Sequence, residues 1–284
     1  MAASSHPVRS ISLPARSHPT SLKIEETINK LKNRDIYPSE STSCYASGAD
    51  SIQLGLLNLV ELYAHLQDLI NSLSSQNGKL VEEALESSVS LLDTCSSGRD
   101  LITGFKEQIC ELQSALRRKG YSSSEEISMY MSFRKKVAKE VSRCLKVLKL
   151  AEGKFGNTAP LLESDPSTAN LVKLVRETYT ATVAVFKSLF LFLSSPTKAS
   201  RWSLVSKLVT KNSGARSTSK VAGILNEVSG VDLALQNDKK VDVMLVRGKI
   251  QALDANLQII EGELGCLFRC LLQNRVSLLN ILTN

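Results

Sequence analysis

The side chains most often used in catalysis are few in this sequence and stand apart from one another. Of the three histidines, two fall within the first eighteen residues, and His65 is the third. Nucleophilic and metal sites need several such groups at defined spacings. His65 has no cysteine or acid at a spacing that suggests a shared site, so we predict a surface or boundary histidine.

Six cysteines are dispersed over the 284 residues, and only one pair of them could meet. Cys266 and Cys270 are four residues apart and would share one face of a helix. Neither a CxxC motif nor a cluster of histidines accompanies them. The pattern predicts reduced, buried thiols, as in intracellular proteins, and no metal site.

Motifs for phosphate binding and hydrolysis are also missing. The Gly-Lys pairs that begin at Gly78, Gly153 and Gly248 lack the glycine spacing and the following Ser or Thr of a phosphate-binding loop. The sequence holds no GxSxG or HExxH motif. Adjacent carboxylates such as Glu25 and Glu26 do not share a helical face. We therefore expect no catalytic residues, no cofactor and no enzymatic activity.

One short motif near the N-terminus carries a mechanism. Residues 1–20 are rich in Ser, Pro, Ala, Arg and His and contain no acid, which predicts a disordered tail. Arg9 stands three residues before Ser12, a context that suits basophilic kinases. Together with Ser10 and Pro14, a phosphorylated Ser12 would complete the Arg-Ser-x-phosphoSer-x-Pro ligand of 14-3-3 adaptors. The alternative is a tail whose polar residues only keep it soluble.

Beyond this tail, apolar residues recur with a helical period, and strand-like alternation is lacking. The periodic segments are residues 21–34, 50–73, 79–118, 123–152, 164–195 and 242–279. In the last of them, ten inward positions from Val246 to Leu278 alternate spacings of four and three, and further apolar residues widen the face. The sequence therefore predicts an all-α, elongated multi-helix bundle with long, coiled-coil-like helices, in one domain over residues 21–284.

Basic residues gather in two places within a net charge of +7. In the segment 123–152, one helical face is apolar and the opposite face carries a basic stripe. The stripe consists of Lys135, Lys139, Arg143, Lys146 and Lys149. A second block, without acids between Thr178 and Asn226, includes Lys198, Arg201, Lys207 and Lys211. Both patterns favour an anionic partner, and the alternative is a solvated basic face.

An anionic membrane surface and nucleic acid are the alternatives to a protein partner. The apolar run Val183–Leu193 is too short to cross a bilayer, which needs ~20 residues, and predicts a central core helix. Alternatively, residues 183–220 would bind an anionic membrane surface through apolar insertion and basic attraction. Nucleic acid is disfavoured, because the basic stripe lacks interleaved aromatic residues and any recognition motif.

Three short stretches, spread over nearly the whole length of the chain, carry a family resemblance. They are SISLPARSHP at 10–19, SALRRKG at 114–120 and RVSLLNIL at 275–282. These stretches resemble the BYPASS-like group, a plant-specific family of uncharacterised helical proteins. The resemblance implies a land-plant protein with relatives linked to root and shoot development, and it supplies no activity, cofactor or site residue. We therefore expect a non-enzymatic interaction or regulatory protein whose protein partner is unidentified.

The expected compartment is the cytoplasm. An N-terminus without acids and with several Ser and Arg residues is also typical of a plastid transit peptide, which is the alternative. Three prolines within the first nineteen residues argue against the amphipathic helix that such peptides form.

The tail motif predicts that Arg9 and Pro14 act at different steps. On a synthetic peptide covering residues 5–18, Pro14→Ala should weaken binding of a 14-3-3 adaptor to the Ser12 phosphopeptide, because the proline turns the bound chain out of the groove. The same change should leave kinase turnover on the unmodified peptide nearly intact. Calorimetry and a kinase assay measure the two steps. Equal adaptor binding with and without phosphate would contradict the motif.

Overall fold

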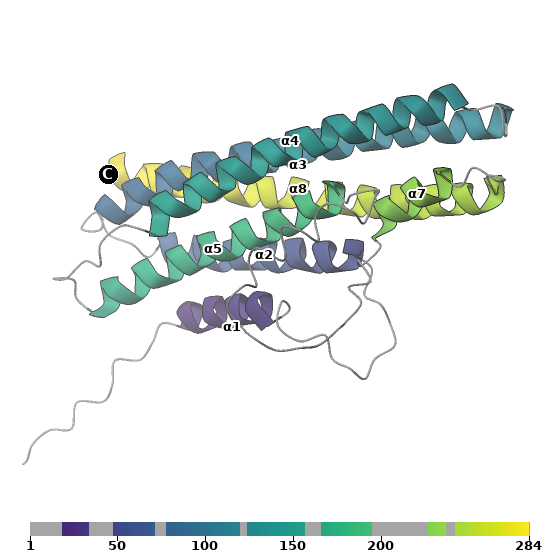
Figure 1. The fold of residues 1–284 in the computed structure, drawn as a ribbon. Coiled ribbons are helices and arrows are strands. Elements are labelled where there is room, and N and C mark those ends of the chain that lie inside the picture. Colours follow the sequence, from purple (N-terminus) through teal and green to yellow (C-terminus); the bar gives the residue numbers. More distant parts are fainter. Residues whose placement is uncertain are drawn as a thin grey trace, which may run out of the picture.

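A computed structural model describes residues 19–33, 48–71, 78–119, 124–156, 166–194, 226–236 and 242–283. This described part of the chain forms seven helices and no strand, which confirms the all-α prediction (Figure 1). The helices are α1 (Pro19–Asn33), α2 (Gly48–Asn71), α3 (Gly78–Lys119), α4 (Ser124–Gly156), α5 (Pro166–Ser194), α7 (Glu227–Leu235) and α8 (Val243–Thr283). The tail motif of Arg9, Ser10, Ser12 and Pro14 lies outside the described residues.

Helix α8 is the central element of the bundle. At ~1.5 Å per residue its 41 residues span roughly 60 Å, and α2 and α3 pack along it (Figure 1). The predicted seam is confirmed, because the ten buried residues of α8 are the ten predicted inward positions. They are Val246, Ile250, Leu253, Leu257, Ile260, Leu264, Leu267, Leu271, Asn274 and Leu278.

The other helices complete one core around this seam. Helix α4 packs on α3 and α5, α1 packs on α2 and α5, and α7 packs on α8. A single cluster of buried hydrophobic side chains includes residues from all seven described helices. The run Val183–Leu193 forms the C-terminal part of α5 and contributes Phe186, Leu189 and Phe190 to that core. The interpretation of this run as a core helix is confirmed.

Helix α3 is continuous through the small residues Cys95–Gly98. Gly98 is buried, and a Cβ built there would lie 3.5 Å from Leu189 and 3.8 Å from Leu264. The glycine therefore lets α5 and α8 approach the backbone of α3 closely, which accounts for a residue that otherwise lowers helix stability.

Two apolar residues that fit the helical period of their segments are not in the core, and one helix was not predicted. Leu22 and Val89 are exposed by 55% and 43%. Leu22 falls on the side of α1 away from Ile24, and near Val89 the inward position belongs to Ser88, whose hydroxyl accepts from Arg275 at 2.8 Å. The missed helix is α7, a nine-residue helix too short to give a clear period.

Within the ranges described above, the structure contains no helix both long enough and apolar enough to span a membrane.

The cysteines differ in burial, which predicts an order of reactivity. Cys95 and Cys144 are buried as expected, whereas Cys110 is exposed, contrary to the prediction. Burial raises the pKa of the Cys95 thiol to about 12, so its thiolate is scarce near neutral pH. At about pH 8, iodoacetamide should modify Cys110 in the folded protein and Cys95 only on unfolding, as mapped by mass spectrometry. Equal labelling rates for Cys95 and Cys110 in the folded protein would contradict this packing.

Candidate functional site

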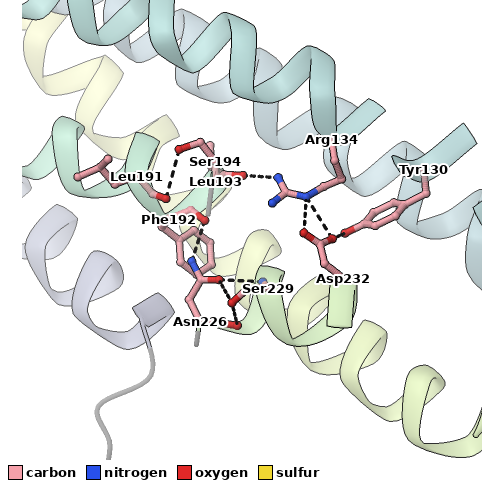
Figure 2. Close-up of polar contacts among 9 residues, drawn as sticks. All are labelled: Tyr130, Arg134, Leu191, Phe192, Leu193, Ser194, Asn226, Ser229 and Asp232. Carbon is pink, nitrogen blue, oxygen red and sulfur yellow. Dashed lines mark hydrogen bonds and ion pairs between the residues drawn. The ribbon is translucent and has the colours of Figure 1, made fainter. Parts of the chain in front are cut away.

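The most polar part of the interior is a cluster formed by α4 and α7 (Figure 2). The Nε of Arg134 donates to both carboxylate oxygens of Asp232, at 3.2 Å to Oδ1 and 3.0 Å to Oδ2. The hydroxyl of Tyr130, one turn before Arg134, donates to Oδ1 at 3.0 Å. Their exposed fractions are 6% for Arg134, 0% for Asp232 and 1% for Tyr130. The ion pair is therefore shielded from water.

The guanidinium of Arg134 also reaches two further helices. Its Nη1 donates to the carbonyl of Leu193 at 2.5 Å, in the last turn of α5. Its central carbon lies 5.4 Å from the ring centroid of Phe105 on α3, a cation–π contact. One side chain on α4 thus binds α3, α5 and α7.

A second contact joins the end of α5 to the start of α7. The side-chain oxygen of Asn226 accepts from the backbone N–H of Ser229 at 2.9 Å, as an N-cap does. Its Nδ2 donates to the carbonyl of Phe192 at 2.8 Å (Figure 2). Carbonyls in the last turn of a helix have no partner within the helix, so Asn226 and Arg134 each satisfy one of them.

Burial governs the protonation of the cluster. It raises the pKa of Asp232 above its usual value, and Arg134 and Tyr130 oppose that shift. It also raises the pKa of Tyr130 well above the usual value, so this phenol keeps its proton and donates it. An Arg, a Tyr and an Asp together could serve acid–base chemistry in a cleft. Here their polar atoms face one another and a backbone carbonyl, so the cluster fastens helices together.

The basic stripe lies on the opposite, outer face of α4. Lys135, Lys139, Arg143, Lys146 and Lys149 are all exposed. Arg143 pairs with Glu140 on the same helix at 3.2 Å. At ~1.5 Å per residue, the stripe runs for roughly 21 Å from its first lysine to its last. The other predicted basic residues, Lys198, Arg201, Lys207 and Lys211, lie outside the described residues.

Sequence reasoning missed the buried pair. Arg134 stands four residues after Tyr130 and three before Val137, so the helical period places it on the apolar face of α4. That position was the available signal. Asp232 gave none, because α7 was not predicted and the two residues are 98 positions apart.

The prediction for His65 needs one correction. Glu61, one turn earlier, lies 3.7 Å from its Nε2, so an acid is within reach. The predicted boundary position agrees with a side chain that is 21% exposed. In the described part of the chain, no three His, Cys, Asp or Glu side chains are grouped so that they could hold a metal ion.

Comparison with known proteins shows which family the chain belongs to. The family model described as Protein BPS1 matches residues 55–281, which include α3, α4, α5 and α7, most of α2 and all of α8 except its last two residues. The chain belongs to the BPS1 family. The predicted resemblance to the BYPASS-like group agrees with this match. No curated protein and no solved structure matches the chain.

The buried pair in this BPS1-family protein predicts a non-additive loss of stability. Arg134→Met should lower the free energy of unfolding by about 3–5 kcal/mol, because it leaves the Asp232 carboxylate buried without a counter-charge. Asp232→Leu should cost a similar amount, and the double variant should cost much less than the two together. Urea unfolding followed by circular dichroism measures all three.

The matched control breaks a more exposed ion pair between α4 and α5. Lys187 and Glu152 lie 2.6 Å apart, with side chains 35% and 33% exposed. Lys187→Met should cost no more than about 1 kcal/mol. A cost for Arg134→Met as small as the control's, or fully additive effects of the two core substitutions, would contradict the fastening role.

Proposed function

We propose that this BPS1-family protein is a non-enzymatic interaction or regulatory protein of plant cells that acts in root and shoot development. The family match supports the plant and developmental parts of the proposal. The exposed basic stripe on α4 carries the interaction part. Its partner is an acidic protein surface, and its compartment is the cytoplasm.

The geometry favours the basic stripe over the buried cluster as the working surface. Arg134 and Asp232 are buried and bound to each other, so they hold the fold together. The stripe, in contrast, is exposed, and the same packing fixes its position. Arg134 and the Lys187–Glu152 pair both tie α4 to α5, and Phe133 packs on Phe105 of α3 with ring centroids 5.1 Å apart. A charged surface on a rigid helix suits specific recognition, because the side chains are positioned before the partner arrives.

Anionic membrane binding is less well supported as an alternative. It requires the apolar run Val183–Leu193 to enter lipid, but Val183, Phe186, Leu189 and Phe190 are fully buried in the core. Removing them would cost the packing of α5 on its neighbours. The rest of the 183–220 region falls outside the described residues apart from Ser194.

Proximity labelling in root tissue tests the proposal. The wild-type chain should label a defined set of soluble proteins, and Lys139→Glu combined with Lys146→Glu should lose part of that set. Lys23→Glu with Lys173→Glu is the control, because it makes the same charge change at exposed sites on α1 and α5. The control should keep the wild-type set.

Two outcomes would contradict the proposal. An unchanged set of labelled proteins in the Lys139/Lys146 variant would remove the basic stripe from the interaction. Labelling dominated by membrane proteins, together with flotation of the purified chain on anionic vesicles at low salt, would favour the membrane alternative.

A further inference from the structure

The outer face of the α3–α4 pair carries charges of both signs. On α3, an acidic stripe of Asp93, Asp100 and Glu107 repeats every seven residues, and all three side chains are exposed. Seven residues are close to two helical turns, so these carboxylates follow one line along α3. On α4, the basic stripe runs along the exposed side of the helix, opposite its buried face. In the described part of the chain, no ion pair connects the two stripes.

The two stripes are aligned in height along the bundle. Phe105 packs on Phe133, and Ser97 hydrogen-bonds to Cys144, so α3 and α4 run antiparallel. Counting along both helices from these two contacts places opposite charges at the same level. Asp100 is level with Lys139, and Asp93 is level with Lys146.

An apolar patch lies at one end of this face, beyond Asp93 and Lys146. Counting further in the same direction brings Val89 on α3 level with Leu150 on α4. These side chains are 43% and 71% exposed, and Val147 beside them is 47% exposed. Exposed apolar groups next to complementary charge are the composition of a protein interface.

We propose that two copies of this chain pair through this face, with the acidic stripe of each copy on the basic stripe of the other. A two-fold axis parallel to the helices places α3 of one copy over α4 of the other without changing any residue's height. Asp100 then faces Lys139 of the second copy, Asp93 faces Lys146, and Val89 faces Leu150. The inference rests on the proposed role of the basic stripe and names its acidic partner.

Charge also excludes the competing symmetric arrangement. An axis across the helices, in the plane of contact, would stack α3 on α3 and α4 on α4. Carboxylates would then face carboxylates, and lysines would face lysines, which costs free energy. Only the parallel axis makes the face self-complementary.

The size of the face predicts a weak pairing. From Val89 to Glu107 it extends roughly 27 Å, and two helices of ~10 Å each give it a footprint of about 500 Å² per copy. Stable complexes bury about 800 Å² per partner, so this dimer should be transient and sensitive to salt.

Sedimentation velocity of the full chain tests the pairing through charge exchange. At up to about 300 µM in low salt the wild type should form dimers, and about 0.5 M NaCl should weaken them at least about tenfold. The variant Lys139→Glu/Lys146→Glu should be monomeric, as should Asp93→Lys/Asp100→Lys. An equimolar mixture of these two variants should dimerise again, because each reversed stripe meets its opposite. A chain with all four substitutions should also dimerise.

A control variant carries the same charge change at sites away from this face. Lys23→Glu/Lys173→Glu changes net charge equally and should dimerise like the wild type, while circular dichroism checks that every variant is folded. A monomeric wild type, or charge-reversed chains that fail to recover dimers when mixed, would overturn the pairing. Proximity labelling that still depended on Lys139 and Lys146 would then leave the proposed function standing with a different acidic partner.

Discussion

The bundle depends on a single seam along α8. Its ten inward residues, from Val246 to Leu278 at alternating spacings of four and three, keep one face turned toward α2 and α3 for roughly 48 Å. A helix of this length cannot bury that face alone, so its neighbours must be long enough to cover it. The 42 residues of α3 match the 41 of α8, and α2 covers part of the rest. The other helices are placed relative to this framework.

Polar contacts fix the positions of the helices that the α8 seam does not contact along its length, α4 above all. Arg134 ties α4 to α3, α5 and α7, and Asn226 holds the start of α7 against the end of α5. A buried pair of this kind adds little stability compared with apolar packing, but its loss is costly, so it specifies one arrangement of helices. By fixing α4 on its inner side, it sets the orientation of the outer, basic face. Burial at Arg134 and exposure at Lys135 are therefore two sides of one constraint, since neighbouring residues on a helix point about 100° apart.

The sequence predicted the long helices, whose apolar spacing repeats many times. It did not predict features that depend on contacts between residues far apart in the chain. Long helices repeat their apolar spacing many times, so α2, α8 and the stripe on α4 were predicted close to their observed form. Helix α7 has only nine residues, and its buried Asp232 needs the hydrogen bonds that Arg134 and Tyr130 of α4 donate to it. Val89 fits the helical period as well as Ser88 does, but Ser88 faces inward and accepts a hydrogen bond from Arg275 of α8. The levels of Asp93 and Asp100 against Lys146 and Lys139 likewise need the antiparallel register, which contacts such as Phe105 with Phe133 supply.

We conclude that α8 is the rigid helix on which the charged α3–α4 face is mounted. Native-state hydrogen exchange measures this rigidity residue by residue. The amides from Ile250 to Leu271 should exchange slowest, only on global unfolding, together with the facing amides of α2 and α3. Those of α7 and the ends of α4 should open at lower free energy. Exchange from the middle of α8 as fast as that from the ends of α4 would contradict the claim.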